Sequence, residues 1–272
     1  LDTNASINNG TRMPTSAARL TDASTAVVGF GHSGHNSAGG NAAVIGSDGV
    51  LKRMIGGTGS YESRACTIGS DAVVSSLYVD PIINRANYFS GALTRRDPQI
   101  DFGGYGTNYP SRQDIACGEN ATLGKYAVVG NGGPGVNWRL RYYKINSETS
   151  WQQLGAEVRV TTSSVNSWRS TAPLGIAVGG NKGVSIYRDQ DTDGRAQIYF
   201  VRFTLGSSGV QLIDTVGTKI SLSLSSYEGL SASVAYSGSG DDFYIALYQG
   251  GTAATGQPAN TQQAVTLIRL NH

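Results

Sequence analysis

A short apolar segment recurs along the chain, and this repetition constrains the fold more than any other feature. Ala26-Val27-Val28 is repeated as Ala72-Val73-Val74 and again as Ala127-Val128-Val129. Two degenerate copies follow, Ile176-Ala177-Val178 and Ala232-Ser233-Val234. Copies spaced by roughly 40 to 60 residues indicate that one supersecondary unit is repeated, either stacked or arranged radially.

The composition favours short strands joined by tight turns. The 272 residues include 37 Gly and 14 Tyr, whereas only 15% are charged. Such a chain is poor in the residues that helices prefer, and no window shows a convincing 3.6-residue period. Apolar residues make up 39% of the chain and recur in ordered runs, which is not typical of disorder.

Each repeat is expected to contain three or four antiparallel strands, the first apolar and the later ones amphipathic. A strand that is buried on both faces has an unbroken apolar sequence, as the innermost strand of a propeller blade does. We therefore predict an all-β fold, a β-propeller with about five blades in one domain over residues 1–272. The approximate blades are 21–59, 60–108, 109–165, 166–222 and 223–272, with 1–20 closing the ring. A pair of β-sandwiches or a parallel β-helix explains the repeats less well.

This layout resembles that of small secreted propeller lectins. The resemblance covers the whole chain and rests on the periodicity and the composition described above. It implies that the protein binds glycans or polysaccharides, and that it is extracellular or lies on a cell or virion surface. The chain begins at Leu1, as a mature product after removal of a signal peptide or a trimmed chain would.

Cys66 and Cys117 lie just before the second and third copies of the apolar segment. Matched positions of neighbouring repeats can be close in space, so a disulfide between them is one prediction. It would imply an oxidising compartment. The alternative is two buried free thiols, which are common in protein cores.

An aromatic residue with a nearby Arg precedes several of the apolar segments. Their rings could stack on a sugar face, and an Arg fork could donate two hydrogen bonds to hydroxyl or carboxylate groups. Repeated sites would give avidity for a multivalent glycan. The alternative is that the rings pack between blades. The candidate ligand-binding residues are Tyr61, Arg64, Tyr109, Arg112, Trp168, Arg169, Tyr227 and Glu228.

An acidic segment, Asp189-Gln190-Asp191-Thr192-Asp193-Gly194, resembles a calcium-binding loop. Oxygens at every second residue can surround a hard cation, so Asp189, Asp191, Asp193 and Gln197 are the candidate metal ligands. No Glu closes the loop, and Asp and Gly also favour simple hairpin turns. Calcium is the only cofactor that the sequence suggests.

Several function classes lack their expected signals. The net charge of +2 and the absence of a Lys/Arg cluster argue against nucleic acid. No apolar run approaches the ~18 residues of a membrane helix. The chain has no nucleophile elbow, Walker loop or zinc spacing. Paired acids occur only in expected turns, and the expected inner strands offer mostly Ala, Val, Gly and Ser, which argues against a catalytic channel.

These observations predict a carbohydrate-binding, lectin-like propeller with repeated rim sites and no chemistry. One alternative is a glycosidase or lyase that acts on polysaccharide from the same scaffold. Another is a structural or adhesive module, such as an appendage subunit or a phage receptor-binding tip. An oligomer is compatible with all three.

Overall fold

The computed structural model describes residues 16–19, 25–30, 41–56, 62–79, 82–90, 93–102, 112–133, 136–161, 172–190, 196–220, 231–250 and 263–272. The chain divides into two compact units. One contains Leu1–Ala127 and Tyr143–Gln152, and the other contains Val128–Tyr142 and Gln153–His272. The described elements are all β-strands. Among the described residues there is no helix long and apolar enough to cross a membrane.

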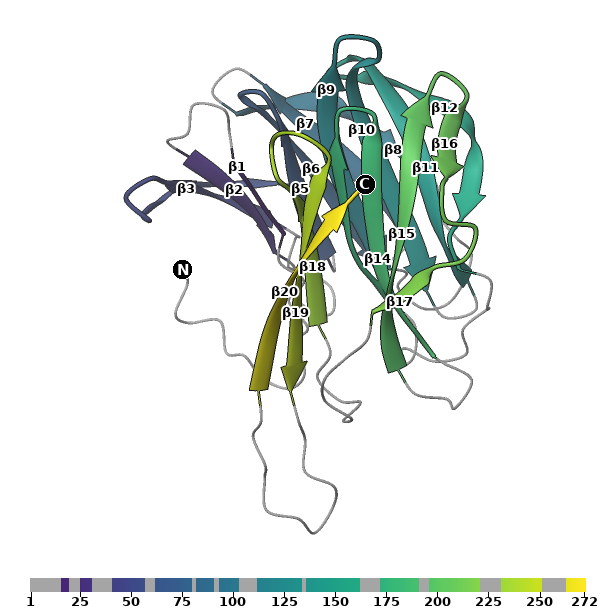
Figure 1. Ribbon diagram of the computed structural model, residues 1–272. Helices are drawn as coiled ribbons and strands as arrows, with labels where there is room; N and C mark the ends of the chain where they lie inside the picture. The colour runs from purple at the N-terminus through teal and green to yellow at the C-terminus, as the bar shows by residue number, and fades with distance from the viewer. Residues whose placement is uncertain are drawn as a thin grey trace. The chain divides into compact units, whose positions relative to one another are not determined.

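Two antiparallel sheets lie wholly within the first unit (Figure 1). The first contains β1 (Ser16–Arg19), β2 (Thr25–Phe30), β3 (Asn41–Gly46) and β4 (Leu51–Gly56). The second contains β5 (Glu62–Ile68), β6 (Asp71–Val79), β7 (Ile82–Ser90) and β8 (Thr94–Asp101). In both sheets each strand pairs with the next one in the chain, as expected for a propeller blade.

A third sheet has the same order and is shared by the two units. It contains β9 (Arg112–Asn120), β10 (Gly124–Gly133), β11 (Val136–Ser147) and β12 (Ser150–Arg159). Along β11 the residues Trp138, Leu140 and Tyr142 are each at most 1% exposed and share one face. This agrees with the alternation that the sequence shows over Trp138 to Ile145.

The remaining two sheets belong to the second unit. One contains β13 (Ala172–Gly179), β14 (Lys182–Gln190), β15 (Ala196–Gly206), β16 (Gly209–Leu212) and β17 (Thr218–Ile220), which pairs with β15. The other contains β18 (Ser231–Tyr236), β19 (Asp242–Gly250) and β20 (Gln263–Asn271). The prediction of an all-β, propeller-like arrangement of antiparallel sheets is thus confirmed. Four sheets have the four or more strands of a full blade, whereas about five blades were expected. The last sheet has three strands among the described residues.

Within each unit the sheets pack through their first strands. In the first unit β5 contacts β1, β2 and β9, and in the second unit β13 contacts β18. The core of the first unit lies between its two complete sheets and consists of Val27, Ala42, Val44, Ala65, Ala72, Val74, Phe89 and Leu93. In the second unit, side chains of β13–β15 and β17 pack against Phe243, Ile245 and Leu247 of β19.

The repeated apolar segment is not always the first strand, which corrects the sequence-based prediction. In the first three sheets it forms the second strand, β2, β6 or β10, whereas its degenerate copies lie in the first strands β13 and β18. The strand registers show the slip: Cys66 pairs with Val73, and Ala177 pairs with Val184, each two residues from the pair that closes the turn. Ala177 therefore corresponds to Cys66 and not to Val73. The sequence did not distinguish the two positions, because second strands that are covered on both faces are as apolar as first strands.

The sequence analysis expected residues 1–20 to close the ring, and of these residues the structure describes only β1. This strand pairs antiparallel with β2, with Ala17 opposite Val28. A short connection to β2 makes this local hairpin the simpler pairing. The sheet of β18–β20 keeps three strands among the described residues.

Candidate functional site

Buried polar residues gather at the start of the two neighbouring first strands β5 and β9. Ser63 and Arg64 in β5 are 0% and 7% exposed, and Gln113 and Asp114 in β9 are 1% and 7% exposed. At the position of β13 that matches Arg64 the residue is Gly175, which is also buried. The polar first strands are therefore a local feature of β5 and β9 and not a general property of the repeat.

Arg64 and Asp114 form an ion pair between the two strands. The Nε atom of Arg64 lies 3.7 Å from Oδ1 of Asp114, and both side chains are at most 10% exposed. The same Nε donates a hydrogen bond to the backbone carbonyl of Gln113 at 3.4 Å. Burying such a pair costs desolvation energy that the attraction between the charges often fails to offset. The pair is therefore weak evidence for stability and better evidence for a functional site.

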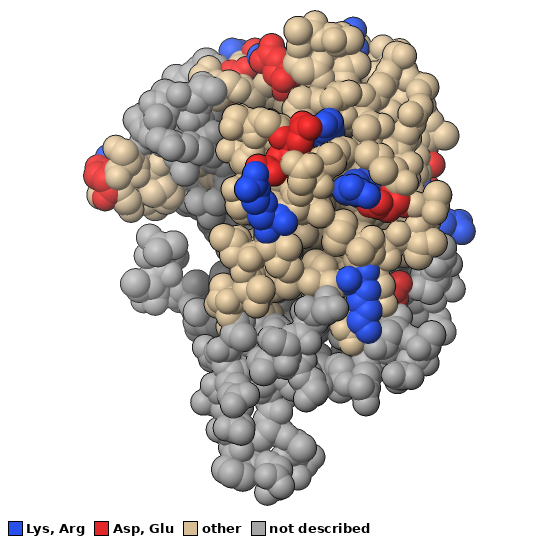
Figure 2. Space-filling view, in the orientation of Figure 1, with Lys and Arg blue, Asp and Glu red and all other residues tan. Residues whose placement is uncertain are grey.

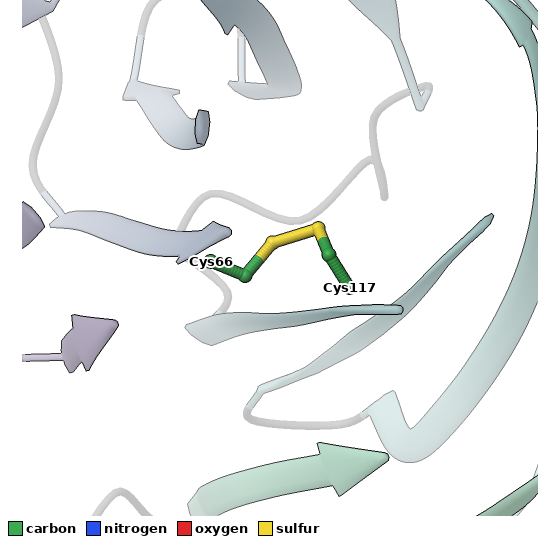
Figure 3. Close-up of a disulfide and its surroundings, with 2 residues drawn as sticks. All are labelled: Cys66 and Cys117. Atoms are coloured by element: carbon green, nitrogen blue, oxygen red, sulfur yellow. A yellow bond between two sulfur atoms is a disulfide. The ribbon is translucent and has the colours of Figure 1, made fainter. Parts of the chain in front are cut away.

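A disulfide fixes these strands next to the ion pair. Cys66 and Cys117 are bonded with their Cα atoms 5.5 Å apart, inside the range that disulfides allow (Figure 3). The predicted disulfide is confirmed, and the alternative of two free thiols is wrong. The bond lies two residues after Arg64 and three after Asp114, so it holds both side chains on strands that cannot slide past each other.

Most of the ligand-binding residues that the sequence suggested lie outside the described residues. These are Tyr61, Tyr109, Trp168, Arg169, Tyr227 and Glu228. Arg112 is the first residue of β9, and Arg64 is the buried partner of Asp114. The structure thus brings the segments of the second and third repeats together, and the proposed binding role of these residues stays a prediction.

The candidate calcium ligands are described only in part. Asp189 and Gln197 face each other across the β14–β15 ladder, whereas Asp191 and Asp193 lie outside the described residues. Within the described ranges, no three His, Cys, Asp or Glu side chains gather as a metal site would require. The calcium site stays a prediction.

Other ionic groups form pairs that brace the sheets. Tyr88 donates a hydrogen bond to Asp71 at 2.7 Å, and Lys125 lies 2.9 Å from the same carboxylate. Burial and this hydrogen bond raise the pKa of Tyr88 to about 12. In the second unit Arg202 donates two hydrogen bonds, of 2.8 and 3.1 Å, to the carboxylate of Asp214. These hydrogen bonds hold the pKa of the Asp214 carboxyl below its usual range. Figure 2 shows basic and acidic residues interspersed on a mostly uncharged face.

Asp114 was missed by the sequence analysis although the sequence carries a signal for it. Ala65-Cys66 and Ala116-Cys117 are matched dipeptides, and aligning the repeats on them would have placed Arg64 and Asp114 at the start of matched strands. The sequence analysis aligned the repeats on the more conspicuous Ala-Val-Val segment instead, and so did not place Arg64 and Asp114 at matched positions. The sequence analysis took the Ala-Val-Val segments for the inner strands and found no acids in them. That argument was wrong, because in the first three sheets these segments are second strands.

The chain is similar in fold to several solved structures. It matches the catalytic domain of a GH62 alpha-L-arabinofuranosidase from Coprinopsis cinerea with a TM-score of 0.54 at 9% identity, over 97% of this chain and 92% of that one. AofleA from Arthrobotrys oligospora gives a TM-score of 0.49 at 10% identity, over 96% and 73% of the two chains. An alpha-L-arabinanase from Cellvibrio cellulosa gives 0.46 at 11% identity, over 96% and 93%. No protein-family model and no curated protein sequence matches the chain.

These likenesses correct the leading functional prediction. The lectin interpretation depended on a resemblance at the level of the fold, and a solved structure that shares this fold is the catalytic domain of a GH62 alpha-L-arabinofuranosidase. The prediction of a lectin-like protein without chemistry is therefore wrong. At such low identity the comparison itself concerns architecture alone. The chain is an all-β protein of propeller-like antiparallel sheets, similar in fold to a glycosidase domain.

Proposed function

We propose that this protein is an enzyme that hydrolyses glycosidic bonds in a polysaccharide. The observation that carries the proposal is the buried Arg64–Asp114 pair on the convergent strands β5 and β9. Hydrolysis of a glycosidic bond requires carboxyl groups at fixed separations, and rigid strands hold such groups better than loops do. The Cys66–Cys117 bond adds rigidity at this point.

Asp114 is the carboxyl group to which this proposal assigns a role. Asp114 faces the guanidinium of Arg64, so it is suited to the charged role, as the nucleophile or as the base that activates water. Arg64 is a positioning residue, since it holds the Asp114 carboxylate and the Gln113 carbonyl together.

The proposal is tested by assaying arabinan, arabinoxylan and xylo-oligosaccharides for release of reducing sugar. We expect hydrolysis by the natural protein and a fall in kcat of at least about 100-fold in Asp114→Asn. Asp214→Asn is a matched control because it also disrupts an Arg–Asp pair, but one in β15 and the segment after β16. It should lower stability and leave kcat unchanged. Full activity in Asp114→Asn, or no hydrolysis of any glycan, would reject the proposal.

A further inference from the structure

The turn between β9 and β10 contains an Asn-x-Thr sequon. The sequence has three Asn-x-Ser/Thr sequons, and Asn120-Ala121-Thr122 is the one that lies within the described residues. In this motif the side-chain nitrogen of Asn is the atom that receives an N-linked glycan. The glycan is bulky, so the sequon has to lie at the surface of the folded protein.

The sequon occupies an exposed turn. Residues 121–122 are exposed and Asn120 is partly exposed. The turn between β5 and β6 lies at the same end of the first unit, because Lys125 at the start of β10 lies 2.9 Å from Asp71 at the start of β6. Residues 69–70 of that second turn are also exposed. Both turns at this end of the unit thus face solvent, which leaves room for a bulky substituent.

The side chain of Asn120 uses its oxygen to hold the turn. Its Oδ1 atom accepts hydrogen bonds from the backbone N–H groups of Thr122 at 3.0 Å and of Leu123 at 2.6 Å. The atom that receives a glycan, Nδ2, takes part in neither bond, so the turn can keep its conformation when Nδ2 carries a sugar. The turn explains Asn120, since Asn often accepts such bonds. It does not explain Thr122, because these bonds use only the backbone of residue 122.

The Cys66–Cys117 disulfide is an independent observation that points the same way. Cys117 lies on β9, three residues before Asn120. Disulfides form in oxidising compartments such as the lumen of the endoplasmic reticulum. The enzyme that attaches N-linked glycans works in the same lumen. One strand therefore carries both a bond that requires such a compartment and an acceptor for the modification made there.

We propose that Asn120 is an N-glycosylation site. The Nδ2 atom of Asn120 forms a bond to C1 of the first sugar, while the bond from C1 to the pyrophosphate of a lipid-linked oligosaccharide breaks. The lipid pyrophosphate leaves with the electron pair, and one amide proton goes to a base of the transferase. This inference is independent of the proposed hydrolysis. Asn120 lies six residues after Asp114 along β9, or about 20 Å away, so the glycan is at the opposite end of the strand.

The test is expression of the chain behind a secretion signal in eukaryotic cells, with protein collected from both the cells and the medium. After reduction, trypsin releases the peptide of residues 113–125, which contains Asn120 and neither of the other sequons. Peptide N-glycosidase converts a glycosylated Asn to Asp, and mass spectrometry detects this change. We expect most copies of the peptide to carry a glycan. An unmodified Asn120 in both fractions would overturn the inference.

Three variants are matched controls. Asn120→Asp keeps a side-chain oxygen for the two backbone hydrogen bonds but removes the nitrogen that receives the glycan. Thr122→Ala keeps the whole side chain of Asn120 and destroys the sequon. We expect complete loss of the glycan from both variants, whereas Thr122→Ser keeps the sequon and should keep the glycan. A glycan on Asn120 in Thr122→Ala, or its loss from Thr122→Ser, would contradict the inference.

Peptide mapping without reduction tests whether the folded turn accommodates the glycan. We expect the glycosylated chains to contain the Cys66–Cys117 bond, because the sequon is exposed when the bond is formed. A glycan that occurs only on chains without this bond would show that the modification is compatible only with misfolded protein, and would overturn the inference.

Discussion

At the scale of single residues, the packing of Trp138 shows how side-chain volume selects glycine. The indole is 1% exposed and donates to Ser185, and its ring lies directly above Gly130. A Cβ on Gly130 would stand 2.1 Å from Cη2 of Trp138 and 2.6 Å from Cδ1 of Ile176. Only a residue without a side chain fits under a ring that is fixed at its nitrogen.

Gly130→Ala should therefore destabilise the protein by about 1–3 kcal/mol, the usual cost of overpacking a core. Urea denaturation followed by tryptophan fluorescence measures the change. Gly206→Ala is the control, because its nearest neighbour would be the Ser208 hydroxyl at 4.0 Å. That variant should be neutral or slightly stabilising. Equal losses from both substitutions would refute the packing explanation.

The Arg202–Asp214 pair predicts a dependence of stability on pH. The hydrogen bonds from Arg202 lower the pKa of Asp214 in the folded state. A carboxyl group whose pKa is lower in the folded state than in the unfolded state stabilises the protein at pH values above its unfolded pKa of about 4. This contribution to the free energy of unfolding is lost as the pH falls through the pKa of the folded state. Asp214→Asn should lower the free energy of unfolding by about 2 kcal/mol at pH 7.

The difference between the natural protein and Asp214→Asn should shrink as the pH falls below about 4, which thermal melts at several pH values can follow. Asp48→Asn provides the comparison, because Asp48 pairs with Lys52 while both side chains are about half exposed. An exposed pair of this kind contributes little. A difference for Asp214→Asn that persisted at acid pH would contradict the assignment.

At the scale of elements, β5 and β9 form the structural centre of the first unit. Their buried residues include both charges of the ion pair, and their cysteines join the second and third sheets across 51 residues of sequence. Equivalent first strands in the second unit, β13 and β18, contribute Ala177 and Ala232 to the apolar core that they share. The covalent bond thus occurs where the strands also carry buried charge.

Loss of the Cys66–Cys117 bond should destabilise the protein by about 2–4 kcal/mol, because the bond restricts the unfolded chain. Urea denaturation of the Cys66→Ser/Cys117→Ser double variant measures this loss. Adding reductant to the natural protein should lower its stability to that of the variant and should not affect the variant. Two free thiols in the denatured, unreduced natural protein would show that the bond does not form.

At the scale of the whole molecule, three strands belong to both compact units. The boundaries between the units fall at Ala127/Val128 in β10, at Tyr142/Tyr143 in β11 and at Gln152/Gln153 in β12. Unfolding one unit alone would break these strands in the middle and leave backbone hydrogen-bonding groups without partners. The units are therefore expected to unfold together.

Calorimetry should consequently show one cooperative transition, with a calorimetric enthalpy equal to the van't Hoff enthalpy. Reduction of the disulfide, which lies in the first unit, should move the whole transition to lower temperature. Two resolved peaks, of which only one responds to reductant, would show that the units unfold independently.

The sequence by itself determined the fold class, and it offered a Cys66–Cys117 disulfide as one of two alternatives between which the structure decided. Strand alternation, turn composition and repetition are local properties, so they remain visible in Trp138–Ile145 and in the matched positions of Cys66 and Cys117. The order of strands within each sheet was decided only by the tertiary structure. An apolar run indicates that a strand is covered on both faces. Both first and second strands of a sheet can be covered in this way, so the run does not distinguish them. The same holds for Arg64 and Asp114, whose burial and contact depend on two strands about 50 residues apart packing together, an effect of long-range packing that no local pattern records.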